Sequence, residues 1–376
     1  MKRIFGAFAA AAAFGATLPG FHALTITSDL KMGYQLVVAD LNRDGKPDLI
    51  AVDERGTELA WYENPTWVRH VLVKDVPRTI NLDVFDYDGD GIPEIAMGHH
   101  FETNPEKSIG NVLILKAGAD PREPWSVREI DRVPTVHRLR WIDWKGDGHK
   151  VLLVAPMIGV KARAPEYADN VPVYLYRPGE WKREVFTEEP RGILHSITPV
   201  GWKGRAEQLM TADFLGIRLF APGGPMEISK GDPRPCPQCG SSEIKMGRLG
   251  KHRFIAAIEP WHGSQVVVYT ESGNQWKRNV IEENMINGHA LAVGDLDGDG
   301  RDEIIAGFRG KGFQLYVFAA EDATGEHWER HVLDDGGIAA ADCKIADFSG
   351  HGRPEVACIG ASTGNIRMYM PSLGHR

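Results

Sequence analysis

Short apolar runs recur along the chain from residue 24 onward, and polar, glycine-containing segments separate them. Two of these runs lie at residues 94–98 and 303–307. Each follows an acidic segment, which itself follows another apolar run. This arrangement is typical of β-strands joined by hairpin loops, so the pattern predicts an all-β protein.

Two motifs repeat with a common period of about 50 residues. The first is an acidic loop, complete at residues 40–48, 86–94 and 295–303 and degenerate at 143–148 and 347–355. The second is a Trp followed by basic or polar residues, at Trp67, Trp125, Trp181, Trp276 and Trp328. The longest interval, from Trp181 to Trp276, spans two units. About seven such units fill the chain, which is within the range of β-propellers with four strands per blade.

We therefore expect a seven-bladed β-propeller of four-stranded blades, in which the recurring Trp residues open the outermost strands and pack the blades. The last unit stops after its third strand, at residues 366–369. Residues 24–27, at the mature N-terminus, are expected to supply the missing strand and close the ring, which removes exposed sheet edges. The propeller then forms one domain over residues 24–376.

Residues 1–23 have the organisation of a secretory signal peptide. Lys2 and Arg3 precede an apolar run that extends to about residue 18, and a small residue, Ala23, ends the segment. The protein is thus expected in the periplasm or outside the cell. No later segment has about 18 consecutive apolar residues, so no membrane span is predicted. A net charge of −8 argues against nucleic acid as a partner.

Export makes disulfides possible for the four cysteines. Cys236 and Cys239 form half of a zinc-ribbon signature that has no second half. A local disulfide or a pair of free thiols is therefore favoured over a structural zinc site. For Cys343 and Cys358 the sequence leaves the redox state open.

The three complete acidic loops place oxygen ligands at alternate positions around one centre, and a Gly permits the sharp turn. Hard oxygen ligands suit Ca²⁺, so a structural calcium site is expected in each loop. The alternative is a set of turns capped by Asx side chains without metal. The candidate ligands are Asp40, Asn42, Asp44, Asp48, Asp86, Asp88, Asp90, Glu94, Asp295, Asp297, Asp299 and Glu303. A strand follows each loop where an EF-hand has a helix, and in this the sequence resembles the VCBS and FG-GAP repeat propellers, which implies calcium loops between blade strands.

Aligning the units on the first Asp of each loop places one residue per blade at the start of the innermost strand: Tyr34, Ile80, His137, His195, Ser241, His289 and Ala341. Converging imidazoles suit Zn²⁺ or another divalent transition metal. His137, His195 and His289 are therefore predicted to point at the central axis as metal ligands. Asn81 and Asp342, one position later, would add oxygen ligands. The alternative is packing, with each His bonded to a backbone carbonyl.

Loops on the same predicted face carry further polar side chains: His99, His100, Glu102, Glu259, Trp261, His262 and Arg309, with Arg138 beside them. A polar funnel with Trp261 and Arg138 or Arg309 suits a sugar. His99, His100 and His262 are candidate bases, because neutral His titrates close to working pH. Glu259 is a candidate acid, and Glu102 would complete the carboxylate pair of a glycosidase.

Residues 253–263 and 287–295 look like the propeller part of the aldos-2-ulose dehydratases. This resemblance implies metal-assisted elimination of water from keto-sugars. The first functional hypothesis is thus a secreted metal-assisted lyase or dehydratase that performs β-elimination next to the carbonyl of a keto-sugar or uronate. The second is a non-catalytic, calcium-stabilised propeller that binds a glycan or a protein. Inward-pointing His favour the lyase, and whether the protein is an enzyme stays open at this point.

Overall fold

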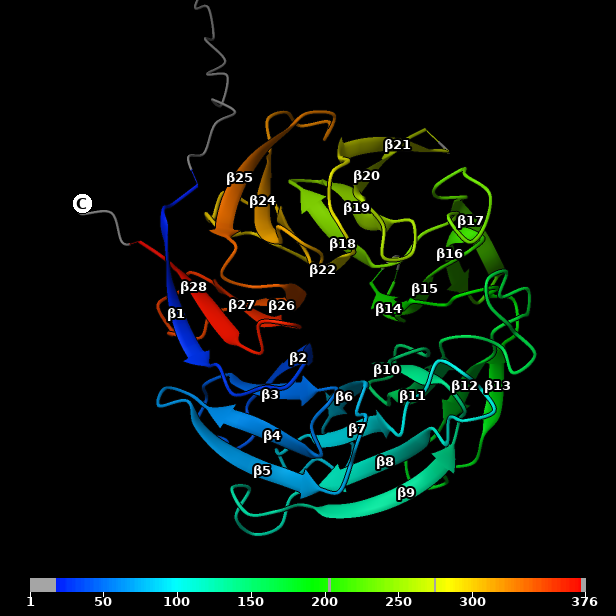
Figure 1. The fold of residues 1–376 in the computed structure, drawn as a ribbon, viewed down its shortest axis with the longest axis vertical. Helices are drawn as coiled ribbons and strands as arrows, with labels where there is room; N and C mark the ends of the chain where they lie inside the picture. Colours follow the sequence, from blue (N-terminus) through cyan, green and yellow to red (C-terminus); the bar gives the residue numbers. More distant parts are fainter. Residues whose placement is uncertain (1–17, 202–203, 274, 373–376) are drawn as a thin grey trace, which may run out of the picture.

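The computed structural model describes residues 18–201, 204–273 and 275–372. These ranges contain 28 strands and no helix, and the strands form seven antiparallel sheets of four. Figure 1 shows the sheets as blades around a common axis, which confirms the all-β, seven-bladed propeller. Most of the signal peptide predicted at residues 1–23 lies outside the described residues. Within them, no helix could cross a membrane.

The first four blades follow one another along the chain. Blade 1 contains β2 (Gly33–Ala39), β3 (Asp48–Asp53), β4 (Glu58–Glu63) and β5 (Val68–Lys74). Blade 2 contains β6 (Asn81–Phe85), β7 (Glu94–His99), β8 (Asn111–Lys116) and β9 (Ser126–Arg132). Blade 3 contains β10 (Val136–Ile142), β11 (Val151–Pro156), β12 (Val173–Tyr176) and β13 (Glu184–Thr187). Blade 4, which lacks the recurring Trp, contains β14 (Ser196–Val200), β15 (Gln208–Asp213), β16 (Gly216–Ala221) and β17 (Gly224–Ser229).

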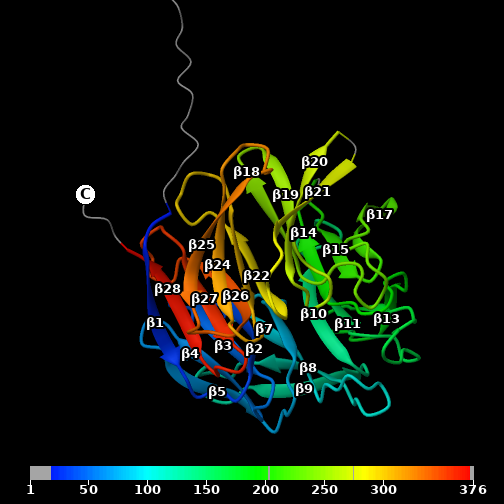
Figure 2. The same cartoon turned by 45° about the horizontal axis from the view of Figure 1, so that its top comes forward.

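The last three blades complete the ring. Blade 5 contains β18 (Ile244–Leu249), β19 (His252–Glu259), β20 (Gln265–Ser272) and β21 (Gln275–Glu282). Blade 6 contains β22 (Gly288–Gly294), β23 (Glu303–Phe308), β24 (Gln314–Ala320) and β25 (Trp328–Asp335). Blade 7 contains β26 (Ala340–Ala346), β27 (Glu355–Gly360), β28 (Ile366–Pro371) and, as its outermost strand, β1 (Phe21–Thr27). The first strand of each blade lies nearest the axis, as the tilted view of Figure 2 also shows.

The two ends of the chain meet in blade 7, where β1 pairs antiparallel with β28 and places Leu24 opposite Met368. Figure 1 shows this contact as the blue strand beside the red one. The strand begins at Phe21, three residues before the predicted start, because Phe21 and the residues after it continue the ladder to Pro371. The N-terminal strand therefore closes the ring.

Apolar side chains fill the space between neighbouring blades. The largest fully buried ones include Trp61, Phe254 and Tyr369. The recurring Trp residues take part in this packing, since Trp125 and Trp181 are buried. This rigid scaffold holds the starts of seven inner strands around one axis.

Both cysteine pairs are disulfides. Cys343 and Cys358 lie directly opposite each other on β26 and β27 and join these strands. Cys236 and Cys239, for which the sequence left a local disulfide and a pair of free thiols open, form the disulfide in the segment between β17 and β18. No cysteine of the described residues is left as a zinc ligand.

Candidate functional site

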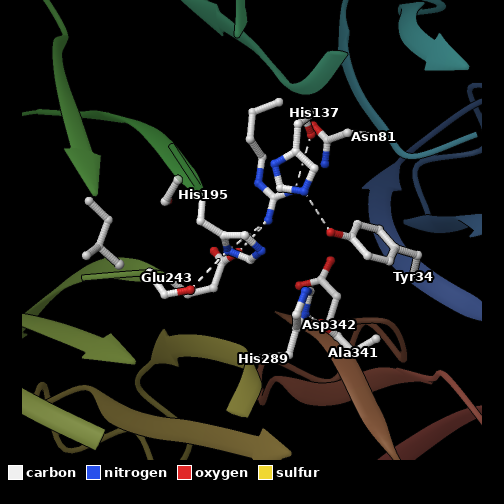
Figure 3. Close-up of polar contacts among 12 residues, drawn as sticks. Tyr34, Asn81, His137, His195, Glu243, His289, Ala341 and Asp342 are labelled. Carbon is white, nitrogen blue, oxygen red and sulfur yellow. Dashed lines mark hydrogen bonds and ion pairs between the residues drawn. The ribbon is translucent and has the colours of Figure 1, made fainter. Parts of the chain in front are cut away.

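A β-bulge begins the innermost strand of four blades. In β2, β10, β22 and β26 the pairing register skips one residue, and the skipped residues are Tyr34, His137, His289 and Ala341. A bulge leaves its extra residue unpaired and turns its side chain in a new direction. Figure 3 shows Tyr34, His137 and His289 directed into the same central space.

In the other three blades the equivalent residue comes just before the first strand. Ile80, His195 and Ser242 each donate a backbone N–H to the second strand of their own blade, at 3.0, 3.1 and 3.0 Å. The sequence alignment gave Ser241 for blade 5 and is wrong by one residue. Blade 5 lacks the acidic loop that anchors the alignment elsewhere, so the sequence offered only Gly247 as a substitute.

Four imidazoles lie together at the axis. Ring centroids are 4.9 Å apart for His137 and His195, 5.2 Å for His195 and His289, and 5.3 Å for His289 and His262. His195, His262 and His289 each offer one nitrogen within 4.8 Å of the others, a spacing from which one metal ion could be held. The loop residue His262 thus takes the place that the sequence analysis gave to His137.

Two neighbouring side chains contact the Nε2 atom of His137. Its Nε2 lies 2.9 Å from the Tyr34 hydroxyl and 3.1 Å from Arg138 Nη1. Because both neighbours can donate a proton, Nε2 acts as the acceptor of these contacts. Burial and the Arg138 charge hold the pKa of His137 well below its ordinary value. The structure therefore couples His137 to Tyr34 and keeps its ring neutral.

In two of the four imidazole rings, one nitrogen is hydrogen-bonded and the other is free to bind a metal. His195 Nδ1 lies 2.9 Å from the Glu243 carboxylate, and His289 Nδ1 lies 2.5 Å from the carbonyl of Ala341. These acceptors fix the proton on Nδ1, which leaves the lone pair on Nε2. Both Nε2 atoms are buried and have no hydrogen-bond partner within the described structure. Burial lowers the pKa of His195 to about 4, so its ring is neutral near pH 7.

Glu243 connects the cluster to a buried ion pair. Its carboxylate contacts Arg138 Nη2 at 2.5 Å as well as His195. Although burial alone would raise its pKa, Arg138 and His195 hold the pKa of Glu243 well below the usual range. Glu243 is therefore an anion that orients His195 and neutralises Arg138.

Asn81 and Asp342 brace neighbouring blades. Asn81 Oδ1 accepts the backbone N–H of Leu139 at 3.0 Å, and Asp342 accepts that of Leu36 at 3.1 Å. Asp342 also binds Lys344 at 2.6 Å. Both residues line the central cavity with His289, and these contacts engage the oxygens that the sequence analysis expected to bind the metal.

Glu259 and Arg309 lie in blades 5 and 6. The buried carboxylate of Glu259 contacts Tyr269 at 2.5 Å and Arg278 at 2.8 Å, on the two strands outside its own. These contacts hold Glu259 within blade 5, away from the histidine cluster. Arg309 Nη2 lies 3.3 Å from His262 Nε2, so this candidate does lie at the cluster.

His99 and His100 form a separate pair in blade 2. Their ring centroids are 4.5 Å apart, and burial, with the neighbouring His100, lowers the pKa of His99 to about 4. Phe101 connects this pair to His137, with ring centroids 5.7 Å apart. Glu102 lies 3.5 Å from Arg78. The carboxylate pair considered from the sequence, Glu102 with Glu259, is thus engaged with arginines at two different places.

The acidic loops have the turn geometry expected from their sequence. In each complete loop the first residue, Asp40, Asp86 or Asp295, accepts the backbone N–H of the Gly five residues later at 2.9 Å. Asp86, Asp88 and Asp90 bring three carboxylates within 4.8 Å of one another, and so do Asp295, Asp297 and Asp299. In the second loop the Lys116 ammonium contacts Asp88, Asp90 and Glu94. Burial raises the pKa of Glu303, which closes the third loop, to about 8.

The sequence analysis missed Glu243 and Ser242. A usable signal was present, because Glu243 is a charged residue at the start of a buried inner strand. Buried carboxylates need a partner, and that requirement points to the Arg138 and His195 that it contacts.

Comparisons with known proteins agree with the geometry. An FG-GAP-like repeat matches residues 40–97, and an FG-GAP repeat matches residues 287–318. An aldos-2-ulose dehydratase from Phanerodontia chrysosporium is 24% identical over 241 residues, which are 54% of this chain and 26% of that protein.

Solved structures show the same fold at low identity. The extracellular domain of the putative one component system BT4673 from B. thetaiotaomicron is 13% identical, with a TM-score of 0.60 over 94% of this chain and 40% of that one. BBS1N, solved in complex with ARL6DN, is 12% identical, with a TM-score of 0.58 over 95% of this chain and 97% of that one. The chain is therefore a seven-bladed propeller that carries FG-GAP repeats and is distantly related to a protein named aldos-2-ulose dehydratase.

Proposed function

We propose that His195, His262 and His289 bind one divalent transition metal and that the protein is a lyase, which eliminates water or an alcohol next to the carbonyl of a sugar. The observation that carries this proposal is the pair of buried, unpartnered Nε2 atoms on His195 and His289, each with its Nδ1 proton held by a fixed acceptor. This is the arrangement of metal-binding histidines, whose second nitrogen donates to a carboxylate or carbonyl.

A bound divalent metal would polarise the carbonyl and acidify the adjacent C–H bond. Tyr34 and His137 are placed to move the proton. The Tyr34 hydroxyl donates to His137 Nε2 at 2.9 Å, so His137 can accept the phenol proton while Tyr34 takes one from the sugar. The same pair, run in reverse, returns a proton to the departing oxygen. Burial and the Arg138 charge keep His137 neutral, so its Nε2 lone pair is available as the acceptor of the Tyr34 hydrogen bond.

The relatives add support at a coarser level. The name of the distant relative describes removal of water from a sugar derivative, and the match covers about half of this chain. The aromatic pair formed by Trp261 and Tyr167, with ring centroids 6.2 Å apart, is a suitable surface for a sugar ring beside His262.

We further propose a structural calcium role for the acidic loops and an exported location for the protein. The acidic loops bind Ca²⁺ in a structural role, which the clustered carboxylates of residues 86–90 and 295–299 support. The protein is exported to the periplasm or the outside of the cell, where its two disulfides are stable.

The direct test is an elimination assay together with metal analysis. Purified protein is incubated with keto-sugars and with uronate oligosaccharides, and the ultraviolet absorbance of the unsaturated product is followed. His195→Ala should lose both the metal and the activity. The matched control is His149→Ala, an exposed histidine of an acidic loop in blade 3, which should keep both.

Two outcomes would overturn the proposal. One is full activity in His195→Ala. The other is a wild-type protein that holds no transition metal and converts none of these sugars, which would leave the non-catalytic glycan-binding propeller as the better account.

A further inference from the structure

Arg309 is a partly buried cation that has no anionic partner among the described residues. Its Nη2 contacts His262 Nε2 at 3.3 Å and the Asn287 side-chain carbonyl at 3.1 Å, and both groups are uncharged near pH 7. Its Nε is buried and has no hydrogen-bond partner. Among the described residues, no carboxylate lies within ion-pair distance of this guanidinium.

Three other arginines inside the blades are paired with carboxylates. Arg138 contacts Glu243, and Arg278 contacts Glu259 at 2.8 Å. Arg218 contacts the buried Asp213 at 2.8 Å. A desolvated charge without a partner is costly, so the missing anion at Arg309 points to a ligand that supplies it.

The centre of the ring has a local excess of positive charge. The cavity at the axis is lined by four cations and two carboxylates: Arg138, Arg140, Lys245, Lys344, Glu243 and Asp342. The whole chain has a net charge of −8, so this excess is confined to the centre. A cavity with an excess of one sign of charge concentrates ligands of the opposite sign, and Arg309 contacts His262 of the neighbouring histidine cluster.

The neighbouring Trp261 indicates what kind of anion fits. Its ring centroid lies 4.7 Å from that of His262, and its indole Nε1 is buried with no hydrogen-bond partner in the described structure. An indole can stack on the C–H face of a sugar ring and donate to a hydroxyl. A buried donor without an acceptor needs one from the ligand. An acidic sugar supplies both the carboxylate and the hydroxyls.

We propose that Arg309 binds the carboxylate of an acidic sugar, so that the substrate is a uronate-containing glycan and not a neutral keto-sugar. This inference rests on the proposed lyase function and names its substrate class. A guanidinium fork matches a carboxylate in two parallel hydrogen bonds. Negative charge develops on the carboxylate when the neighbouring C–H bond breaks, and Arg309 stabilises it there.

The elimination is balanced without an oxidant or reductant. The C–H bond next to the carboxylate breaks, the base takes the proton, and the electron pair forms the new C=C bond. The C–O bond on the next carbon breaks, and its oxygen leaves as an alcohol after it receives a proton.

Calorimetric titration tests this assignment. The protein as isolated is titrated with trisaccharides of galacturonate, glucuronate and mannuronate and with their methyl esters, which have the same shape without the charge. At least one acid should bind about ten- to hundredfold more tightly than its ester, the range expected for hydrogen bonds to a charged group. Arg309→Met should abolish that preference, and Arg309→Lys should retain part of it. Arg132→Met, an exposed arginine on β9, is the matched control and should behave as wild type.

Equal binding of acid and ester, no binding of either, or a preference that persists in Arg309→Met would each overturn the assignment. The metal content of every variant is measured in parallel. Conversion of neutral keto-sugars without Arg309-dependent acid binding would leave the lyase standing and remove the inference. Arg309-dependent binding of the acid without any elimination would keep the Arg309 assignment and overturn the lyase function.

Discussion

Replacing Glu243 by Gln removes the one charge that both neutralises Arg138 and orients His195. The side chains of Arg138 and Glu243 are only 5% and 11% exposed, so solvent cannot replace the lost partner. Breaking a buried ion pair from one side costs about 3–5 kcal/mol of folding free energy. For a domain of this size we expect a fall in the melting temperature of about 4–7 °C.

The same substitution removes the acceptor of the His195 Nδ1 proton. Loss of such a partner weakens metal binding by about 10- to 100-fold. Both effects are measured on one preparation, by thermal unfolding followed with Trp fluorescence and by calorimetric titration with Zn²⁺.

Two controls separate the effects. Glu106→Gln breaks an ion pair at the surface, in which the Arg163 side chain is 55% exposed and the Glu106 side chain 71% exposed. This substitution should change the free energy of unfolding by less than about 1 kcal/mol. The double variant Arg138→Met with Glu243→Leu removes both charges, so it should recover most of the stability but none of the metal affinity. A Glu243→Gln protein as stable as Glu106→Gln, with unchanged zinc affinity, would refute this reasoning.

Three further predictions follow from other parts of the ring. Burial lowers the pKa of Lys245 to about 8, so the unfolded chain binds more protons than the folded one between about pH 8 and 10, and stability should rise with pH in that window. In Lys245→Met this rise, measured by urea unfolding at pH 7.5 and 10, should be smaller, and an unchanged rise would contradict the assignment. The Cys343–Cys358 bridge closes a loop with a sequence separation of 15, so the double Cys→Ala variant should lose about 3 kcal/mol of stability in urea, and no loss would be inconsistent with a formed bridge. Calcium should raise the melting temperature of the wild type, chelation should lower it, and Asp297→Ala should reduce the calcium effect; a response identical to wild type would exclude the third loop as a site.

The repeating elements of the fold were predictable because each blade repeats the same local chemistry. The acidic loops and the recurring Trp mark hairpins and outer strands at fixed places in each unit, and the chain length then sets the blade number. Closure by the N-terminal strand followed from the incomplete last unit.

The site was predictable only in part. A bulge at the start of the inner strand is a local change of register that leaves no mark in the sequence. Asn81 and Asp342 were expected as metal ligands, and their hydrogen bonds to the backbone of neighbouring blades have no sequence signal either. Blade 5 has no acidic loop, and for that reason Ser242 and Glu243 were misplaced or missed. In the close group of three histidines His262 joins His195 and His289, whereas His137 Nε2 is contacted by Tyr34 and Arg138. Such side-chain contacts between blades have no periodic signal.

The central claim is a transition metal held by His195, His262 and His289. Elemental analysis of the purified protein, dialysed without chelator, tests it most directly. The account predicts about one zinc, manganese or similar ion per chain in the wild type and in His137→Ala, and loss of that ion in His289→Ala. Calcium as the only metal, or a transition metal that His289→Ala retains, would contradict it.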